Sequence, residues 1–157
     1  MTTKIKKLFA LVFCMSVVGT AIAKDTYDYD NNCPKPNGGK MVTDKWKFYQ
    51  CECTSYAADK MNEHKVNLTN SYKGVRWGYA SNWINAASQA GISYNSTPKN
   101  RDIAWFSYGH VAYVESVDSK GNITVSEYNY KSYDYNMRTI KKGSSAYPKY
   151  FIHFGAK

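Results

Sequence analysis

The chain has 157 residues, of which 21 are Lys or Arg and 12 are Asp or Glu, so its formal net charge is +9 at neutral pH. This length is that of one domain, and we expect no second one. The positive charge favours polyanionic partners, among them anionic cell-wall polymers, nucleic acid and acidic lipid headgroups, without choosing among them. The 15 Tyr and 4 Trp suit a cleft for carbohydrate or peptide, but a Tyr-rich β protein without such a cleft fits them equally.

The first 23 residues have the pattern of an export signal. Lys4, Lys6 and Lys7 carry positive charge, residues 8–18 are apolar apart from one serine, and Ala21-Ile22-Ala23 ends the segment with small residues. The apolar run is shorter than the roughly 20 residues that a membrane-spanning helix needs. We therefore expect a Sec signal peptide that is cleaved after Ala23, and a secreted or periplasmic protein that is not stably inserted in a membrane.

Three cysteines remain after this cleavage: Cys33, Cys51 and Cys53. An odd number in an exported chain indicates one disulfide and one free thiol. A bridge between Cys33 and Cys51 would leave Cys53 free and stabilise the fold by about 3 kcal/mol. The alternative bridge, between Cys33 and Cys53, would remove that thiol. Loss of the signal also lowers the formal net charge from +9 to +6, because three lysines leave with it.

The helical patterns lie in the first half of the remaining chain. Residues 24–40 are polar and rich in Asp, Asn, Pro and Gly, and we expect an irregular leader there, followed by one folded domain over residues 41–157. Apolar spacing predicts a helix from Thr54 to Glu63 and a second from about Ala80 to Ala90, where Gly91 provides the stop.

Strand patterns follow Pro98. The predicted strands are Ile103 to Phe106, His110 to Val117, Asn122 to Tyr130 and Tyr150 to Phe154. The turn sequence at residues 118–121 joins the second and third of them as a hairpin. Helices first and antiparallel strands afterwards indicate an α+β fold.

Cys53 and His110 are the first candidates for chemistry. Cys53 stands directly before the first predicted helix, where free N–H groups and the helix dipole favour an anion and lower a thiol pKa. His110 begins a strand, directly after Gly109. A thiolate nucleophile and an imidazole base are the pair that a cysteine hydrolase needs. An exported Cys is commonly disulfide-bonded and a single His commonly a surface residue, so neither position carries the assignment alone.

Glu127 and Asn129 are candidates to complete the site. Residues two apart on a strand share a face, and the hairpin places this pair roughly opposite His110 and Ala112. A carboxylate or amide there would hold the imidazole in the right tautomer. The alternative is that both are solvent-facing residues of an edge strand.

The order and spacing of these pieces resemble the CHAP domain, a family of cysteine- and histidine-dependent amidohydrolases and peptidases. The matching pieces are CTSYAADK from Cys53, WGYASNW from Trp77, GHVAYVESV from Gly109, ITVSEYN from Ile123, and the terminal YFIHF. The resemblance implies a papain-like α+β fold, with N-terminal helices packed on an antiparallel sheet. It implies that Cys53 is the nucleophile, that His110 is the base, and that Glu127 and Asn129 are the other two site residues.

The resemblance also implies a substrate. Most of the family cleaves peptidoglycan, either between muramic acid and L-alanine or within the stem and cross-bridge peptides. We therefore expect a peptidoglycan amidase or endopeptidase that works as a monomer, without nucleic acid as a partner. One alternative is a non-catalytic wall-binding module. The other is an amidase of peptide–polyamine conjugates, and export and a basic surface are unfavourable for this second alternative.

Three positions depart from the family pattern. Glu52 stands where the family usually has Gln, and a carboxylate beside the thiol would raise its pKa. Gln50-Cys51 mimics the usual Gln-Cys pair, which makes Cys51 a rival nucleophile, although Thr54 matches only when Cys53 is aligned. Arg101 replaces a usual Gly.

No cofactor is expected. Some phage members of the family bind calcium through an acidic loop just before the Cys. Asp25, Asp28 and Asp30 form an acidic cluster here, but it lies further upstream and lacks the Gly of such a loop. We therefore interpret the cluster as part of a solvated leader and expect neither a metal nor an organic cofactor.

Overall fold

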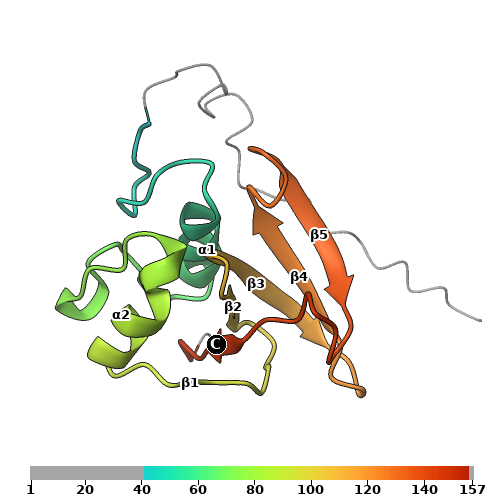
Figure 1. Ribbon diagram of the computed structural model, residues 1–157. Helices are drawn as coiled ribbons and strands as arrows, with labels where there is room; N and C mark the ends of the chain where they lie inside the picture. Colours follow the sequence, from blue (N-terminus) through green and yellow to red (C-terminus); the bar gives the residue numbers. More distant parts are fainter. Residues whose placement is uncertain (1–40, 156–157) are drawn as a thin grey trace, which may run out of the picture.

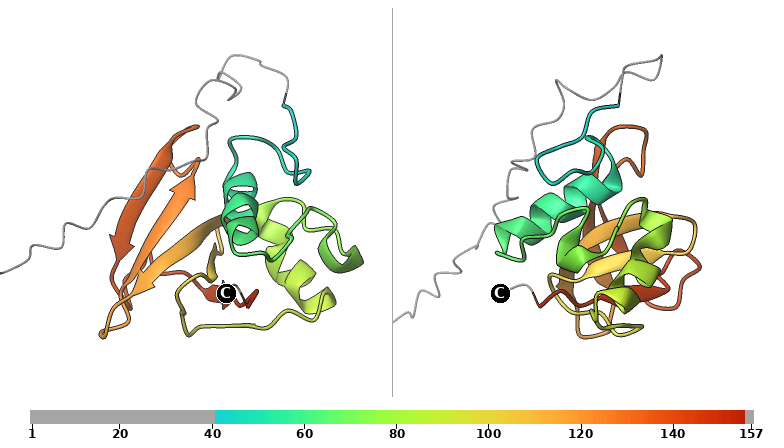
Figure 2. Two further views of the ribbon diagram at one scale, coloured as in Figure 1. Left: turned by 180° about the vertical axis from the view of Figure 1, so that it is seen from behind. Right: turned by 90° about the vertical axis from the view of Figure 1, so that its left-hand side faces the viewer.

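The computed structural model describes residues 41–155 and has an α+β architecture. The helices α1 (Cys53–Glu63) and α2 (Trp83–Gln89) lie on the same side of a six-stranded antiparallel sheet (Figures 1 and 2). Short 3₁₀ turns, η1 (Tyr72–Gly74) and η2 (Ala80–Asn82), lie between them along the chain. The predicted signal peptide and leader lie outside the described residues. In residues 41–155, no helix is both long and apolar enough to span a membrane.

The sheet has the spatial order β1-β6-β2-β3-β4-β5. Its strands are β1 (Tyr94–Asn95), β2 (Ile103–Phe106), β3 (His110–Val117), β4 (Ile123–Tyr128), β5 (Tyr135–Ile140) and β6 (Tyr150–Ile152). The sequence prediction is confirmed for the positions of β2 and β3, and β4 and β6 begin and end within a few residues of their predicted bounds. Two strands, β1 and β5, were not predicted. The second predicted helix is divided, because η2 forms its first turn and α2 the rest.

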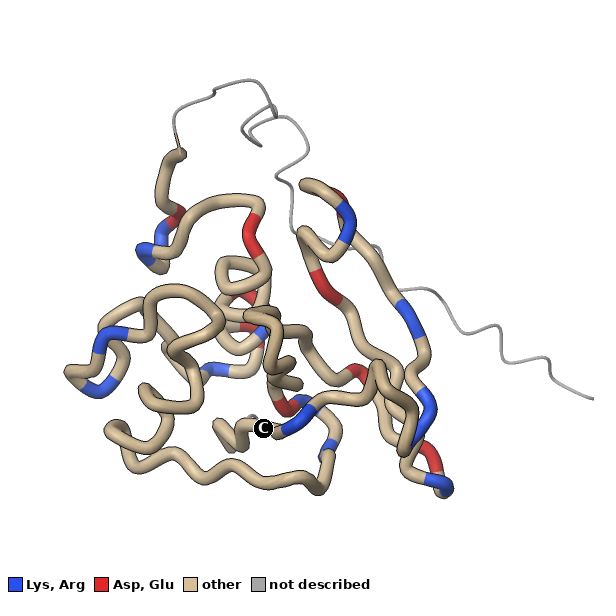
Figure 3. The backbone as a smooth tube through the Cα atoms, viewed as in Figure 1, with Lys and Arg blue, Asp and Glu red and all other residues tan. Residues whose placement is uncertain are grey.

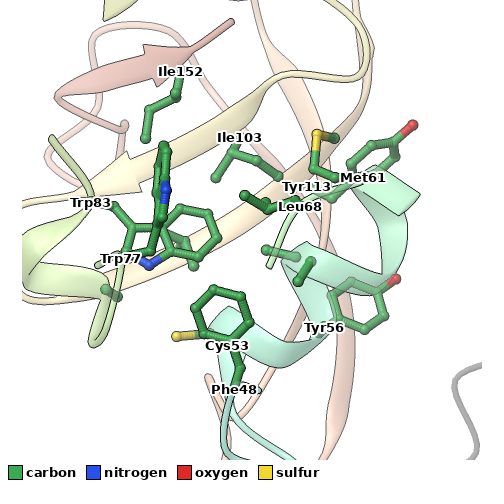
Figure 4. Close-up of a cluster of buried hydrophobic side chains, with 14 of the residues drawn as sticks. Phe48, Cys53, Tyr56, Met61, Leu68, Trp77, Trp83, Ile103, Tyr113 and Ile152 are labelled. Carbon is green, nitrogen blue, oxygen red and sulfur yellow. The ribbon is translucent and has the colours of Figure 1, made fainter. Parts of the chain in front are cut away.

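Apolar side chains fill both faces of this sheet. On the helical side, Trp77, Trp83, Tyr56 and Met61 pack against residues of the strands such as Ile103 (Figure 4). Each of these five side chains is at most 1% exposed. A second, smaller cluster covers the other face and is formed by residues of β2 to β6 together with the partly buried Val117 and Tyr147. Because α1 is packed between the loops and the sheet, its first turn is held at a fixed position over β3.

A buried carboxylate holds the loop before α1 against that helix. Asp44 is 4% exposed and accepts backbone N–H bonds from Trp46 at 2.8 Å and from Phe48 at 2.9 Å. Its other oxygen accepts the hydroxyl of Ser55, in the first turn of α1, at 2.5 Å. Burial raises the pKa of Asp44 above its usual value, although these hydrogen bonds lower it. The loop and the start of α1 are therefore fastened together just where Cys53 stands.

Candidate active site

Cys53 is the first residue of α1 and has a free thiol. It is 7% exposed and lies in the wall of a cleft of about 630 Å³. The backbone N–H groups of Val111, Thr54 and Cys53 lie close enough to the sulfur to lower the pKa of the thiol. Because Val111 directly follows His110, the thiol lies beside the start of β3, as the sequence pattern predicts.

Burial dominates the acidity of this thiol. The pKa of Cys53 is raised to about 12: burial is the largest cause and the negative charge of Glu52 adds to it, while the three neighbouring backbone N–H groups act to lower it. The expectation that the helix start lowers this pKa is therefore wrong, because loss of hydration outweighs the helix N–H groups. The thiol of Cys53 is neutral near pH 7 unless a nearby base takes its proton.

His110 is the candidate for such a base. It is the first residue of β3, is 6% exposed, and its Nε2 lies 2.9 Å from Oε2 of Glu127. The rings of Phe106, Tyr108 and Tyr130 surround the imidazole at centroid distances of 5.7 to 6.1 Å. With Nε2 engaged by Glu127, Nδ1 is the ring nitrogen left to exchange a proton with a neighbour.

Glu127, on β4, is fully buried and strongly hydrogen-bonded. It accepts Nε2 of His110, Nδ2 of Asn136 at 2.7 Å, and Nε and Nη2 of Arg138 at 2.7 and 3.2 Å. Burial acts to raise the pKa of this carboxyl, but the hydrogen bonds from His110, Arg138 and Asn136 outweigh it and the pKa is lowered. Glu127 is therefore ionised, and its carboxylate can only accept hydrogen bonds. The hydrogen bond between the two residues therefore requires a proton on Nε2 of His110, which leaves Nδ1 of the neutral ring as an acceptor.

Arg138 and Asn136 lie on β5 and were not predicted as site residues. Asn136 is the cross-strand partner of Glu127 in the β4–β5 pair, and Arg138 is the partner of Val125. The guanidinium of Arg138 also lies 3.9 Å above the ring of Tyr130. Burial raises the pKa of Tyr108, and the charge of Arg138 acts to lower it. The signal for them in the sequence is weak: Asn136 and Arg138 are two residues apart, as neighbours on one face of a strand are, but the run around them is mostly polar.

Asn129 takes a different place from the one predicted. Continuing the register of Tyr113 with Ser126 puts Glu127 opposite Ala112, as expected. Asn129, however, follows β4 with a positive φ of 58°. Its Nδ2 donates to Oε2 of Glu52 at 2.9 Å, and its Oδ1 accepts the N–H of Tyr133 at 2.9 Å. Asn129 thus holds the residue before Cys53, and within residues 41–155 it makes no hydrogen bond to His110.

Of the remaining cysteines and acidic residues singled out in the sequence, Cys51 lies within the described part of the chain, and the rest lie outside it. Cys51 is fully buried and, unlike Cys53, does not line the cleft. Cys33 lies outside the described residues, so the Cys33–Cys51 bridge stays a prediction, as does the interpretation of Asp25, Asp28 and Asp30. Across the described part of the chain, no group of three or more His, Cys, Asp or Glu side chains is arranged to hold a metal ion.

The reactivity of Cys53 should depend on His110. We expect a His110→Ala variant to react with iodoacetamide at pH 7 at least about tenfold more slowly than the wild type, because a thiol with so high a pKa gives almost no thiolate alone. The rate should recover only as the pH approaches the raised pKa. Mass spectrometry of the Cys53 peptide measures the rate, with His64→Ala as the control. Equal rates in all three proteins would contradict the pairing.

Comparison with known proteins agrees with this geometry. The model of the CHAP domain family matches residues 43–129. The Staphylococcal secretory antigen ssaA2 of Staphylococcus aureus is 48% identical over 82 residues, which are 50% of this chain and 28% of that protein. The Staphylococcal secretory antigen SsaA of the same species is 45% identical over 82 residues, 50% of this chain and 29% of that protein.

One solved structure is similar in fold. It is an N-acetylmuramoyl-L-alanine amidase from Staphylococcus aureus, with a TM-score of 0.56 and 26% sequence identity, and the match covers 75% of this chain and 36% of that one. The chain thus corresponds to less than two thirds of the length of each of these proteins.

Proposed function

Because this chain belongs to the CHAP domain family, we propose that it is an exported cysteine amidohydrolase that cleaves amide bonds of bacterial peptidoglycan. The observation that carries the proposal is the free thiol of Cys53, which lines a cleft and lies beside the start of β3. His110 is the first residue of β3 and is hydrogen-bonded to Glu127 of β4. The similarity to an N-acetylmuramoyl-L-alanine amidase supports the substrate. We assign the fold to the papain-like type on the same grounds, with α1 delivering the nucleophile to an antiparallel sheet.

The proposed reaction has two steps. Nδ1 of His110 takes the thiol proton while the sulfur of Cys53 attacks the amide carbonyl, and the resulting oxyanion accepts the backbone N–H of Cys53. The imidazolium then gives its proton to the leaving nitrogen, the C–N bond breaks, and an acyl-enzyme remains. In the second step His110 takes a proton from water, which attacks the thioester and releases a carboxylic acid and the thiol. Glu127 stabilises the imidazolium in both steps.

Asn129 has an indirect role in this proposal. It fixes the carboxylate of Glu52 by a hydrogen bond and so holds that negative charge beside the thiol. We assign it to the positioning of Glu52 and not to the transfer of protons.

Export is proposed from the sequence and from the names of the relatives. Both curated relatives are described as secretory antigens. We propose that the signal is cleaved after Ala23, that the protein is secreted or periplasmic, that it acts as a monomer, and that Cys33 and Cys51 form a disulfide in the oxidising compartment. The bond cleaved is either the muramoyl–L-alanine amide or an amide of the stem or cross-bridge peptides.

Fragment analysis tests the proposal. Protein beginning at Lys24 is incubated with purified peptidoglycan, and the soluble products are identified by mass spectrometry, with iodoacetamide-treated protein as the control. We expect fragments only from the untreated protein, and their masses identify the bond. Binding to peptidoglycan without release of fragments from any wall type would contradict hydrolysis and favour the wall-binding module. Hydrolysis of peptide–polyamine conjugates alone would favour the other alternative.

A further inference from the structure

Two cationic residues line the cleft that contains Cys53. Lys47 comes from the loop before α1, and Arg76 comes from the segment between η1 and η2. Both are exposed, and neither makes an ion pair with any residue from 41 to 155. Figure 3 shows Lys and Arg on these loops at the helical side of the molecule. The cleft therefore presents positive charge that no described side chain neutralises.

The single acidic residue among the described residues that line this cleft is Glu52. Its carboxylate accepts a hydrogen bond from Asn129 at 2.9 Å. Glu52 directly precedes Cys53, so its charge is fixed next to the thiol, whereas the two cations are carried by other segments of the cleft lining. An anionic group of a bound molecule is therefore favoured near Lys47 and Arg76, and it is disfavoured beside the thiol, where Glu52 is negative.

Asn70 connects the loop that contains Lys47 with the segment that contains Arg76. Its side-chain Nδ2 donates to the carbonyl of Lys47 at 2.9 Å, and its Oδ1 accepts the backbone N–H of Gly78 at 2.7 Å. Its backbone carbonyl accepts the N–H of Trp77 at 3.0 Å, and its own N–H donates to the carbonyl of Trp46 at 3.0 Å. Asn70 therefore fastens the loop of Lys47 to the segment that follows Arg76 before any ligand arrives, which lowers the entropy lost on binding.

The backbone at Lys47 is unfavourable for a lysine. Its φ is +70°, a left-handed conformation that Gly or Asn adopts at lower cost. Strained backbone positions are concentrated at binding and catalytic sites. The Arg76 side chain lies over Gly78. Its Nε is 4.0 Å from the position that a Cβ atom on Gly78 would occupy.

We propose that Lys47 and Arg76 bind a free carboxylate of the peptide part of the substrate. The enzyme then prefers stem peptides whose carboxyl groups are free over the same peptides with those groups amidated. Arg76 has the planar fork of donors that matches a carboxylate, and Lys47 adds a point charge in the same cleft. This inference rests on the proposed function, because it assigns the substrate class of the same cleft.

Binding to two forms of one ligand tests the proposal. The ligand is a synthetic N-acetylmuramoyl stem peptide, made once with free carboxyl groups and once with every carboxyl as a carboxamide. The protein carries Cys53→Ala so that neither form is consumed, and isothermal titration calorimetry measures Kd. We expect the free acid to bind about fivefold more tightly. Added Lys47→Gln or Arg76→Gln should each reduce this preference to about twofold or less.

Matched controls separate a binding site from net charge. Lys45→Gln removes a lysine from the same loop as Lys47, and Lys73→Gln removes one from the segment just before Arg76. Neither Lys45 nor Lys73 lines the cleft. Both should keep the preference. Equal Kd values for the two forms, no measurable binding of either, or loss of the preference in the controls would overturn the proposal. Failure of the proposed function is seen separately, as absence of hydrolysis of both forms by the protein with Cys53 intact.

Discussion

A Cys53→Ala variant is expected to lose peptidoglycan hydrolysis by at least about 10⁴-fold in kcat, because alanine has no atom that forms the acyl bond. The fold should persist, since Ala fills most of the space of the small thiol in the first turn of α1 and is a better helix former. The measurement is the rate of release of soluble fragments from purified peptidoglycan. Thermal unfolding of the same sample shows that the variant is folded.

The control for this experiment removes the other two cysteines together. A Cys33→Ala/Cys51→Ala variant leaves no new unpaired thiol that dissolved oxygen would oxidise to a disulfide with Cys53, and it should retain most of the wild-type kcat. Its Tm should fall, because loss of the predicted bridge costs about 2 to 4 kcal/mol. A folded double variant without activity, combined with an active Cys53→Ala, would assign the nucleophile to Cys51 instead.

Local patterns were sufficient to predict the parts of the site that lie on regular elements. The alternation of residues in β3 and β4 and the turn between them predicted a hairpin, and the hairpin register follows from the face that must be buried. That register brings Glu127 within 2.9 Å of His110. The apolar spacing after Cys53 likewise predicted α1. The elements that carry Cys53, His110 and Glu127 were therefore predicted from sequence, while the catalytic roles of these residues stay predictions.

Features that depend on tertiary contacts were missed or mispredicted. β5 has only one buried residue, Ile140, and its mixed polar sequence gives little strand signal, so Arg138 and Asn136 were not identified. The acidity of Cys53 depends on how much protein covers the thiol, which no local pattern reports. Asn129 was expected to share a face with Glu127, but the chain turns there into a left-handed conformation, and its side chain meets Glu52 instead.

In the proposed mechanism, the contacts of Glu127 link catalysis to stability. Arg138 and His110 share one carboxylate, and Arg138 also contacts the aromatic rings that surround the imidazole. Arg138 thus keeps Glu127 ionised and oriented, but it also takes part of the negative charge that would otherwise stabilise the imidazolium. A single substitution at Glu127 removes the partner of His110 and of Arg138 at once, and the two effects have to be separated by experiment.

A Glu127→Gln variant is expected to lower kcat by about 10³-fold, because a neutral amide stabilises the imidazolium poorly and permits the wrong tautomer of His110. It should also lower the free energy of unfolding by about 3 kcal/mol, since the guanidinium of Arg138, whose side chain is 19% exposed, loses its ion pair. Release of soluble fragments measures kcat, and urea denaturation measures stability. Unchanged kcat would contradict the role of Glu127.

The pH dependence of stability gives an independent check on Glu127. Its pKa is lowered in the folded protein, so the folded state favours the ionised form. The contribution of Glu127 to stability is therefore fully present above the ordinary carboxyl value of 4.5 and is lost as the pH falls through the lowered folded value. The difference in unfolding free energy between the wild type and Glu127→Gln should shrink below about pH 4.5. A difference that grows with acid would show that Glu127 is not held as a carboxylate.

The double variant Glu127→Gln/Arg138→Gln separates the two effects of losing the carboxylate. With both charges removed, no unpaired guanidinium remains, and we expect the free energy of unfolding to recover most of the loss seen in Glu127→Gln. The kcat should stay about 10³-fold below that of the wild type, because His110 still lacks an anion at Nε2. Stability that recovers while kcat does not would assign Glu127 to the chemistry of His110. Recovery of both would mean that Glu127 serves only to neutralise Arg138, and that His110 works as a base without a carboxylate partner.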